Sequence, residues 1–163
     1  MSNGSIASTP LAVSNVTTYA RLSALKRAEP IFRDFFGSDG KTLRHTPRDL
    51  EHRLQCACVR WFRLAYPKHR HNLFAVPNGG YRTPATAAKI KAEGALSGVS
   101  DLILLLARGK YHGLLIEMKT DKGRQSKAQR EWQELIERDG YKYVIVRSIE
   151  EFIKVVTGYL NEQ

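Results

Sequence analysis

Two apolar segments that follow each other closely place the strongest constraint on the fold of this chain, residues 101–106 (DLILLL) and 113–120 (GLLIEMKT). A continuous apolar run such as the first predicts a strand that is buried on both faces of a sheet. The polar residues between the segments, ARGKYH, include a glycine and predict a turn, so that the two segments pair as a hairpin. We therefore expect the core to be built around this pair of strands.

Helix signals surround the predicted hairpin and indicate an α/β fold. Thr46-Pro47 and Thr83-Pro84 each combine an N-cap residue with proline at the first helical position, and Ser148 with Glu151 predicts a capping box. The predicted helices begin at 47, 84, 127 and 149, and the predicted strands are 72–76, 101–106, 113–120 and 141–146. The apolar spacing of the third helix predicts three core residues, Trp132, Leu135 and Ile136. The order α-β-α-β-β-α-β-α predicts a mixed central sheet flanked by helices.

Residues 1–46 differ in composition from the rest of the chain. Residues 1–16 are rich in Ser, Thr, Asn and Ala without an apolar period, which is typical of a tail. Residues 17–36 predict a short helix that is broken near Pro30, and the following GSDGKTLRHT is typical of a linker. We therefore divide the chain into an N-terminal tail with a short helical appendage (1–46) and one main domain (47–163).

The charge of the chain favours a nucleic acid partner. Its 26 Lys and Arg residues against 16 Asp and Glu give a net charge of +10, which attracts a polyanion, although RNA or an anionic membrane surface fits the charge alone. No apolar run approaches the roughly 20 residues of a membrane-spanning helix. Cys56 and Cys58 form neither a disulfide framework nor a zinc pattern. We expect a cytoplasmic protein, associated with the nucleoid or made in a phage-infected cell, that binds no membrane.

Two acids and a lysine stand at the ends of the predicted hairpin. Asp101 opens the first strand, and Glu117 and Lys119 close the second, where alternation places them on one face. Carboxylate oxygens that meet at the end of an apolar sheet predict a Mg²⁺ site, and a nearby ammonium group suits phosphodiester hydrolysis. The spacing alone fits a structural ion pair at a sheet edge equally well.

The order of several short motifs resembles a known nuclease family, the virus-type replication-repair nuclease (VRR-NUC) domain, a branch of the PD-(D/E)XK superfamily. The resemblance covers roughly residues 48–160. It rests on Glu51 with Leu54-Gln55, PNGG (77–80), KAEG (91–94), GVSDL (98–102), IEMKT (116–120), GRQS (123–126) and Gln129. One position departs from the family pattern, because Ser100 precedes Asp101 where the family usually has proline.

The resemblance implies a restriction-endonuclease-like core and a metal-dependent endonuclease that uses Mg²⁺, with Mn²⁺ as a substitute. It implies that the substrate is branched DNA, such as a four-way junction or a flap, and that the protein is a homodimer. Asp101, Glu117 and Lys119 match the catalytic motif, and Gln129 matches the glutamine of the following helix. Glu51 matches the acid that joins Asp101 and Glu117 in holding the metal. The family thus predicts Asp101, Glu117, Lys119 and Gln129 as catalytic residues, and Glu51, Asp101 and Glu117 as metal ligands.

Each additional site residue also has a structural explanation. Glu51 lies in the first turns of a helix, where the dipole favours an acid, and Gln129 is the partner of Ser126 in a capping box. The segment PNGGYR also fits a simple tight turn without a role in binding. Each basic residue, taken singly, also fits a charge that is solvated on the surface. With these alternatives open, the residues predicted to contact DNA are Asn78, Gly79, Tyr81, Arg82, Lys89, Lys91, Lys122, Arg124 and Lys127, with Arg130 beside them.

Two other functions fit parts of the pattern. One is a restriction-type or transposase-associated nuclease with a sequence preference. The other is a basic DNA-binding module without catalysis, against which the intact set of Asp101, Glu117 and Lys119 argues. A compact nuclease of this kind suits a phage or prophage.

Overall fold

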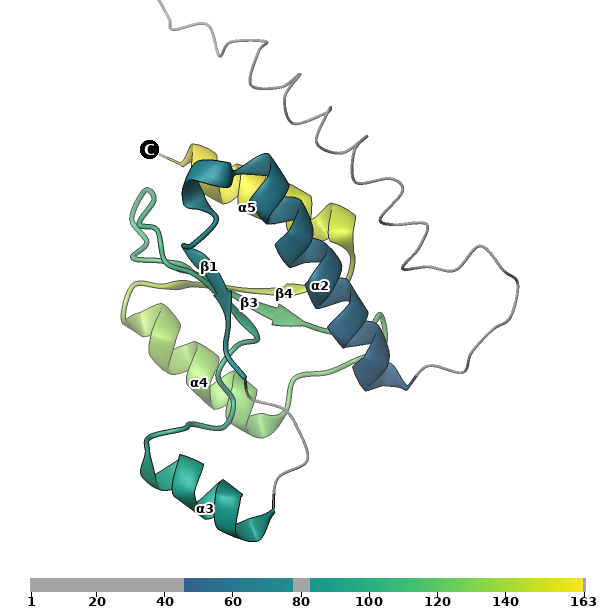
Figure 1. Cartoon of the computed structure of the whole chain (residues 1–163). Helices are drawn as coiled ribbons and strands as arrows, with labels where there is room; N and C mark the ends of the chain where they lie inside the picture. Colours follow the sequence, from purple (N-terminus) through teal and green to yellow (C-terminus); the bar gives the residue numbers. More distant parts are fainter. Residues whose placement is uncertain (1–45, 78–82, 163) are drawn as a thin grey trace, which may run out of the picture.

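The fold is centred on a four-stranded mixed sheet in the order β1-β2-β3-β4 (Figure 1). The structure is a computed structural model that describes residues 46–77 and 83–162. The pairs β1–β2 and β2–β3 are antiparallel, and β3–β4 is parallel. The strands are β1 (Leu73–Ala75), β2 (Leu102–Leu104), β3 (Leu114–Met118) and β4 (Lys142–Val146), and the helices are α2 (Pro47–Ala65), η1 (Pro67–His69), α3 (Pro84–Ala92), α4 (Lys127–Arg138) and α5 (Ile149–Asn161). This order confirms the predicted α-β-α-β-β-α-β-α arrangement and adds a 3-10 turn after α2.

The main hydrophobic core lies between one face of the sheet and the helices α2 and α5, which run side by side (Figure 1). Alternate residues of the central strands, such as Leu102 and Ile116, are fully buried on this face. Trp61 of α2 and Phe152 of α5 meet edge to face, with their ring centroids 5.9 Å apart. Because an aromatic pair of this kind removes a large apolar area from water, this layer holds the two helices on the sheet.

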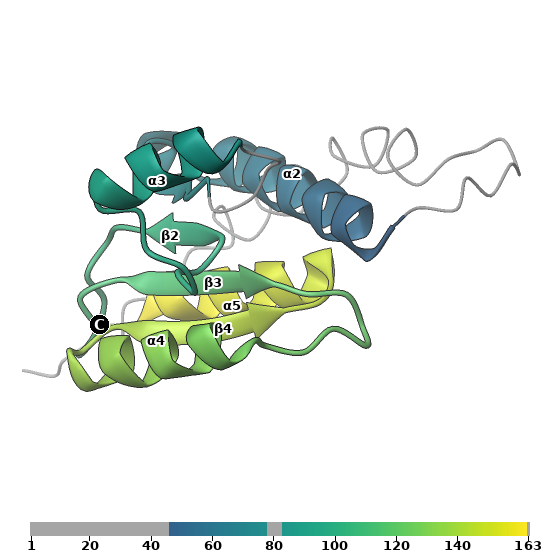
Figure 2. The same cartoon turned by 90° about the horizontal axis from the view of Figure 1, so that it is seen from below.

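On the opposite face of the sheet, α4 packs along β4 (Figure 2) and reaches the neighbouring β3 through Gln129. Tyr143 of β4 packs edge to face on Trp132, whereas Leu105, just past β2, and Leu135 of α4 are 55% and 48% exposed. Two predictions are therefore wrong. The run 101–106 is not a strand buried throughout, and none of Trp132, Leu135 and Ile136 is fully buried. The reason is that no described helix covers the β1–β2 half of this face.

Helix caps explain where the main helices begin. Thr46 and Ser126 each form a complete capping box, with Asp49 and Gln129 respectively. The predicted box of Ser148 and Glu151 is half wrong: the Ser148 hydroxyl accepts the Glu151 N–H, but the Glu151 carboxylate accepts the N–H of Arg147. The predicted tail, the appendage and all of the linker except Thr46 lie outside the described residues.

Helix α3 contributes nothing to the hydrophobic core. None of its residues is buried, and Figure 1 shows it beyond one end of the sheet. No helix in the described part of the chain combines the length and the apolarity of a membrane span.

The loop that leads into β2 rests on the first turn of α4 at Gly98. Gly98 has a φ of +90°, and a Cβ atom at this position would lie 2.5 Å from the carbonyl oxygen of Ala128. A left-handed φ and a backbone contact this short both select glycine. This contact ties the loop before Asp101 to the helix that carries Gln129.

We expect Gly98→Ala to lower the free energy of unfolding by about 2–4 kcal/mol, because left-handed strain and overpacking add together. The matched control is Gly94→Ala, since Gly94 has a similar φ of +97° but no described atom within 4 Å of the added Cβ. The control should lose only about 1–2 kcal/mol. Urea denaturation of both variants measures the difference, and equal losses would contradict the contact.

Candidate active site

Strand pairing brings Asp101 beside Glu117. In the β2–β3 register Leu102 pairs with Ile116, so continuing the pairing by one residue places Asp101 opposite Glu117 on the face that points away from α2 and α5. A carboxylate oxygen of Asp101 accepts the backbone N–H of Met118 at 2.8 Å, which fixes this acid against the end of β3. The hairpin thus brings the two acids together as predicted.

Glu117 and Lys119 form a buried ion pair. The Nζ atom of Lys119 lies 2.6 Å from Oε1 of Glu117, and the two residues are 9% and 0% exposed. Gln129 of α4 donates a second hydrogen bond to the same oxygen, and the hydroxyl of Tyr143 donates to Oε2 at 3.3 Å. A buried carboxylate is costly unless its oxygens are satisfied, and these three donors satisfy both oxygens of Glu117.

Burial also changes the acidity of this site. It raises the pKa of Glu117 to about 7, against the opposing hydrogen bond from Lys119, and the neighbouring Asp101 carboxylate adds to the increase. Burial likewise raises the pKa of Asp101, while the N–H of Met118 and the charge of Lys119 lower it. Two adjacent acids with raised pKa values favour the approach of a cation, which stabilises their ionised forms.

Glu51 connects α2 to the end of β3. Its Oε1 atom accepts the backbone N–H of Thr120 at 3.2 Å. Glu51 and Asp101 both line a cleft of about 300 Å³ between α2 and the ends of β1 and β3. The other residues of this cleft are Arg48, His52 and Gln55 of α2, Ala75, Val76 and Pro77 at the end of β1, and Met118.

The three residues predicted to bind the metal therefore do not all lie on the same cleft. Glu51 and Asp101 lie on the cleft, whereas Glu117 is held behind it by Lys119, Gln129 and Tyr143. Within residues 46–77 and 83–162, no three Asp, Glu, His or Cys side chains are gathered into a ready metal-binding group. Mg²⁺ commonly takes only one or two carboxylates, with waters and phosphate oxygens completing its shell. The carboxylates on the cleft are donors of this kind.

Gln129 serves the helix and the site at once. Its side-chain oxygen accepts the N–H of Ser126 at 2.8 Å, which completes the capping box of α4, while its amide nitrogen donates to Glu117. The two alternatives raised by the sequence are thus combined in one side chain, because an amide carries both an acceptor and a donor.

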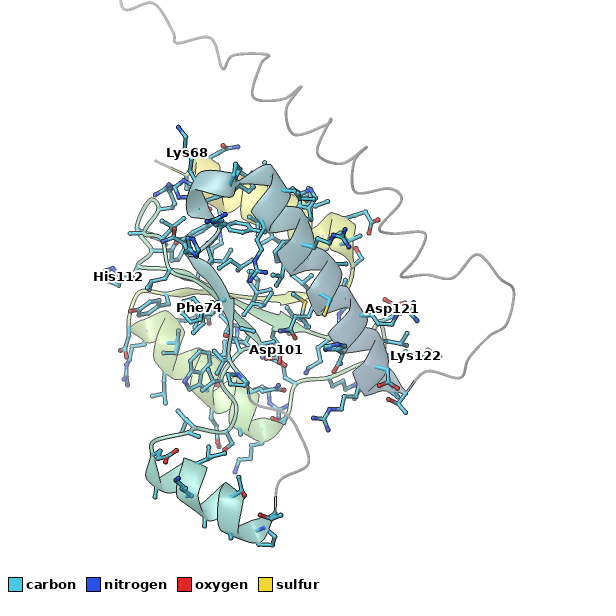
Figure 3. All side chains as sticks on the ribbon, viewed as in Figure 1. Lys68, Phe74, Asp101, His112, Asp121 and Lys122 are labelled. Atoms are coloured by element: carbon cyan, nitrogen blue, oxygen red, sulfur yellow. The ribbon has the colours of Figure 1, made fainter. Side chains whose placement is uncertain are left out.

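The residues predicted to contact DNA are spread widely. Asn78, Gly79, Tyr81 and Arg82 lie outside the described residues. Lys89 and Lys91 are exposed on α3, and Lys127 pairs with Glu131 on α4 at 3.5 Å. Lys122 and Arg124 are exposed on the loop that follows Lys119. Figure 3 shows Lys122 on the opposite side of Asp101 from Lys68 and His112. Arg130 donates to the carbonyl oxygen of Gln125, so it supports that loop.

Four polar residues of the site or its cleft were not predicted as site residues. Arg48 and Gln55 lie three and four positions from Glu51, and His52 lies four positions after Arg48 and three before Gln55, so the helical period could have placed them on the same side of α2. Tyr143 could not have been found in this way, because its approach to Glu117 depends on the parallel register of β3 and β4.

Comparisons with known proteins reveal similarity to one family. The profile of the VRR-NUC domain matches residues 42–150, which include the whole candidate site. A solved structure described as a VRR_NUC domain protein superposes with a TM-score of 0.59 and 32% sequence identity, over 68% of this chain and 87% of that one. No curated protein matches the sequence.

The raised pKa of Glu117 predicts a pH-dependent stability of the metal-free protein. The pKa rises from about 4.5 in the unfolded chain to about 7 in the folded one. Since the folded chain then binds the proton more tightly, the free energy of unfolding falls as the pH rises from about 4.5 to about 7. Glu117→Gln removes this titration. The difference in the free energy of unfolding, variant minus wild type, should therefore increase across that range by on the order of 1–3 kcal/mol.

Urea denaturation in EDTA between pH 4.5 and pH 8 measures this effect. Glu134→Gln removes an exposed acid of α4 and serves as the control, because its difference from the wild type should stay nearly constant with pH. Parallel pH curves for wild type and Glu117→Gln would contradict the raised pKa.

Proposed function

The chain belongs to the VRR-NUC family, as its motifs predicted, and from this premise we propose that it is a metal-dependent endonuclease that hydrolyses DNA at Asp101, Glu117 and Lys119. VRR-NUC domains are nucleases of the PD-(D/E)XK type, and the mixed sheet with flanking helices is consistent with their restriction-endonuclease-like fold. The observation that carries the proposal is the juxtaposition of two acids and a lysine at one end of the β2–β3 hairpin.

Asp101 and Glu51 are the residues that would hold Mg²⁺, or Mn²⁺ in its place, since both line the cleft. Such an ion, when bound, lowers the pKa of a coordinated water and neutralises charge on the phosphodiester. The hydrogen bonds from Met118 to Asp101 and from Thr120 to Glu51 fix the orientations of these carboxylates before substrate arrives. Glu117 supplies further negative charge directly behind them.

Lys119 is the proton-handling and charge-stabilising group. Its ammonium carries three donors, of which one points to Glu117. The remaining donors suit the attacking water and the negative charge that develops on the phosphate oxygens. Because Gln129 and Tyr143 restrain Glu117, the ion pair holds the ammonium in a fixed position. This preorganisation is the contribution of the buried pair to catalysis.

The rest of the cleft suits the backbone of a nucleic acid. Arg48, His52 and Gln55 form a polar wall of α2 beside Glu51 and Asp101, and these side chains donate to phosphate oxygens. The net charge of +10 strengthens attraction to DNA over a longer range. We extend the proposal to branched DNA, a four-way junction or a flap, on the resemblance to the family. Phosphate-directed contacts suit recognition of structure more than of sequence.

We further propose a homodimer. The half of the sheet that α4 leaves open carries exposed apolar side chains, with Phe74 of β1 at 43% and Leu105 at 55% exposure. Exposed apolar groups next to each other favour a partner surface, and a two-fold dimer would match the two symmetric strands of a four-way junction.

We expect the purified protein to cut labelled four-way and flap DNA faster than linear duplex, in Mg²⁺ or Mn²⁺ and not in EDTA. Asp101→Asn, Glu117→Gln and Lys119→Ala should each lower the cleavage rate by at least about 10²-fold, because each removes part of one preorganised unit. Junction binding, measured by gel shift, should change little.

The control is again Glu134→Gln, which should cut at the wild-type rate. Full activity in all three site variants would contradict the assignment. Tight binding without cutting in any metal would favour the non-catalytic module, and cutting of linear duplex at defined sequences would favour a restriction-type enzyme.

Sedimentation of Phe74→Lys/Leu105→Lys tests the dimer. We expect a dimer for the wild type and a monomer for this variant, because two lysines in an apolar interface would be buried without partners. Leu64→Lys, at a 49% exposed position on the opposite layer, should remain dimeric. A monomeric wild type at high micromolar concentration would contradict the proposal.

A further inference from the structure

Arg147 occupies an unusual position between β4 and α5. A single nitrogen of its guanidinium donates to three backbone carbonyls of one loop: Thr120 at 2.5 Å, Gly123 at 2.9 Å and Asp121 at 3.4 Å. We call residues 120–125, which connect Lys119 to α4, the connecting loop. The backbone N–H of Arg147 is itself bound to the Glu151 carboxylate of α5 at 2.8 Å, so this residue is anchored to the last helix.

The start of the connecting loop is held from two sides. The N–H of Thr120 binds Glu51 of α2, and the carbonyl of Thr120 accepts both from Arg147 and from the N–H of Gly123, at 2.9 Å in the latter case. Just before the loop, the N–H of Lys119 donates to the carbonyl of Val146 at 3.0 Å. The loop is therefore fixed between the first helix and the segment that follows β4.

The same loop packs directly on the stem of the candidate catalytic lysine. A Cβ atom added to Gly123 would lie 3.2 Å from Cδ of Lys119 and 3.0 Å from the hydroxyl oxygen of Thr120. The stem of a lysine has four rotatable bonds, so the position of its ammonium is fixed only if the groups that pack around the stem are themselves fixed. Gly123 is one of these groups, and Arg147 donates a hydrogen bond to its carbonyl oxygen.

We propose that Arg147 is a positioning residue of the nuclease site, which closes the connecting loop over Lys119 and so holds the ammonium in register with Asp101 and Glu117. This inference rests on the proposed nuclease function. Arginine is the suitable residue because its planar guanidinium stays charged and reaches one bond further than a lysine ammonium, which sits on a flexible stem and would hold the loop less rigidly. The exposed Lys122 and Arg124 are carried by the same loop, so its closure also sets where their charges lie.

The test compares Arg147→Ala and Arg147→Lys with a control, Arg138→Ala, whose guanidinium is exposed on α4 and binds only the adjacent Asp139 among described residues. We expect Arg147→Ala to lower kcat on a four-way junction by about 10–100-fold, with a much smaller change in KM, because a displacement of about 1 Å at a catalytic group costs this much. Arg147→Lys should retain an intermediate kcat, and guanidinium ion at low millimolar concentration should partly restore Arg147→Ala, whereas urea should not.

Amide hydrogen exchange supplies a readout that does not depend on activity. In Arg147→Ala the exchange of the Gly123 amide should accelerate at least about tenfold, while the amides of β3 and β4 keep wild-type rates. An unchanged kcat, an unchanged Gly123 amide, or faster exchange throughout the sheet would each overturn the inference. If the wild type cuts no DNA, the proposed function fails, and the exchange of Gly123 alone then decides whether Arg147 holds the loop.

Discussion

The burial of one carboxylate, that of Glu117, sets the conditions that the rest of this fold has to meet. Glu117 lies near the end of β3, between the buried residues Ile116 and Met118, and a charge in such a place needs partners for both of its oxygens. The partners come from three separate elements. Lys119 comes from the end of the same strand, Gln129 from the first turn of α4, and Tyr143 from the neighbouring parallel strand. Each of these elements must therefore reach its native position before the acid is satisfied.

Because of this requirement, some of the residues that start a helix or hold a loop in place also hold the acids of the site. The capping box that starts α4 uses the same glutamine that holds Glu117, and the glycine contact at Ala128 brings the loop before Asp101 to that helix turn. On the other side of the sheet, Glu51 of α2 reaches the N–H of Thr120. The raised pKa values of Glu117 and Asp101 follow chiefly from the same burial, which disfavours their charged forms, and a bound cation would stabilise those forms. The apolar layer of α2 and α5 packs on the face of the sheet opposite Glu117, and α2 also takes part in the site through Glu51.

Short-range signals in the sequence were sufficient for the elements and for the central acids. Proline after a capping residue located the starts of α2 and α3, and strand alternation placed Glu117 and Lys119 on one face. Features that depend on long-range packing were not predictable. The exposure of Leu135 depends on how much of the sheet α4 covers, Tyr143 is a partner of Glu117 only through the parallel register, and Glu151 turns to Arg147 because the chain bends before α5. The sequence likewise could not predict that Glu51 and Asp101 line the cleft whereas Glu117 does not, because this depends on how α2 packs beside the strand ends.

In the proposed nuclease, catalysis depends most on the divalent cation that these carboxylates would hold beside Lys119. Crystals of the protein grown with Mn²⁺, and of Asp101→Asn under the same conditions, test this by anomalous diffraction at the manganese edge. We expect one strong peak on the cleft at about 2.0–2.3 Å from an oxygen of Asp101, with Glu51 or Glu117 beside it, and its loss in the variant. A protein without a peak at this position at millimolar Mn²⁺, or with an equal peak in Asp101→Asn, would contradict the account.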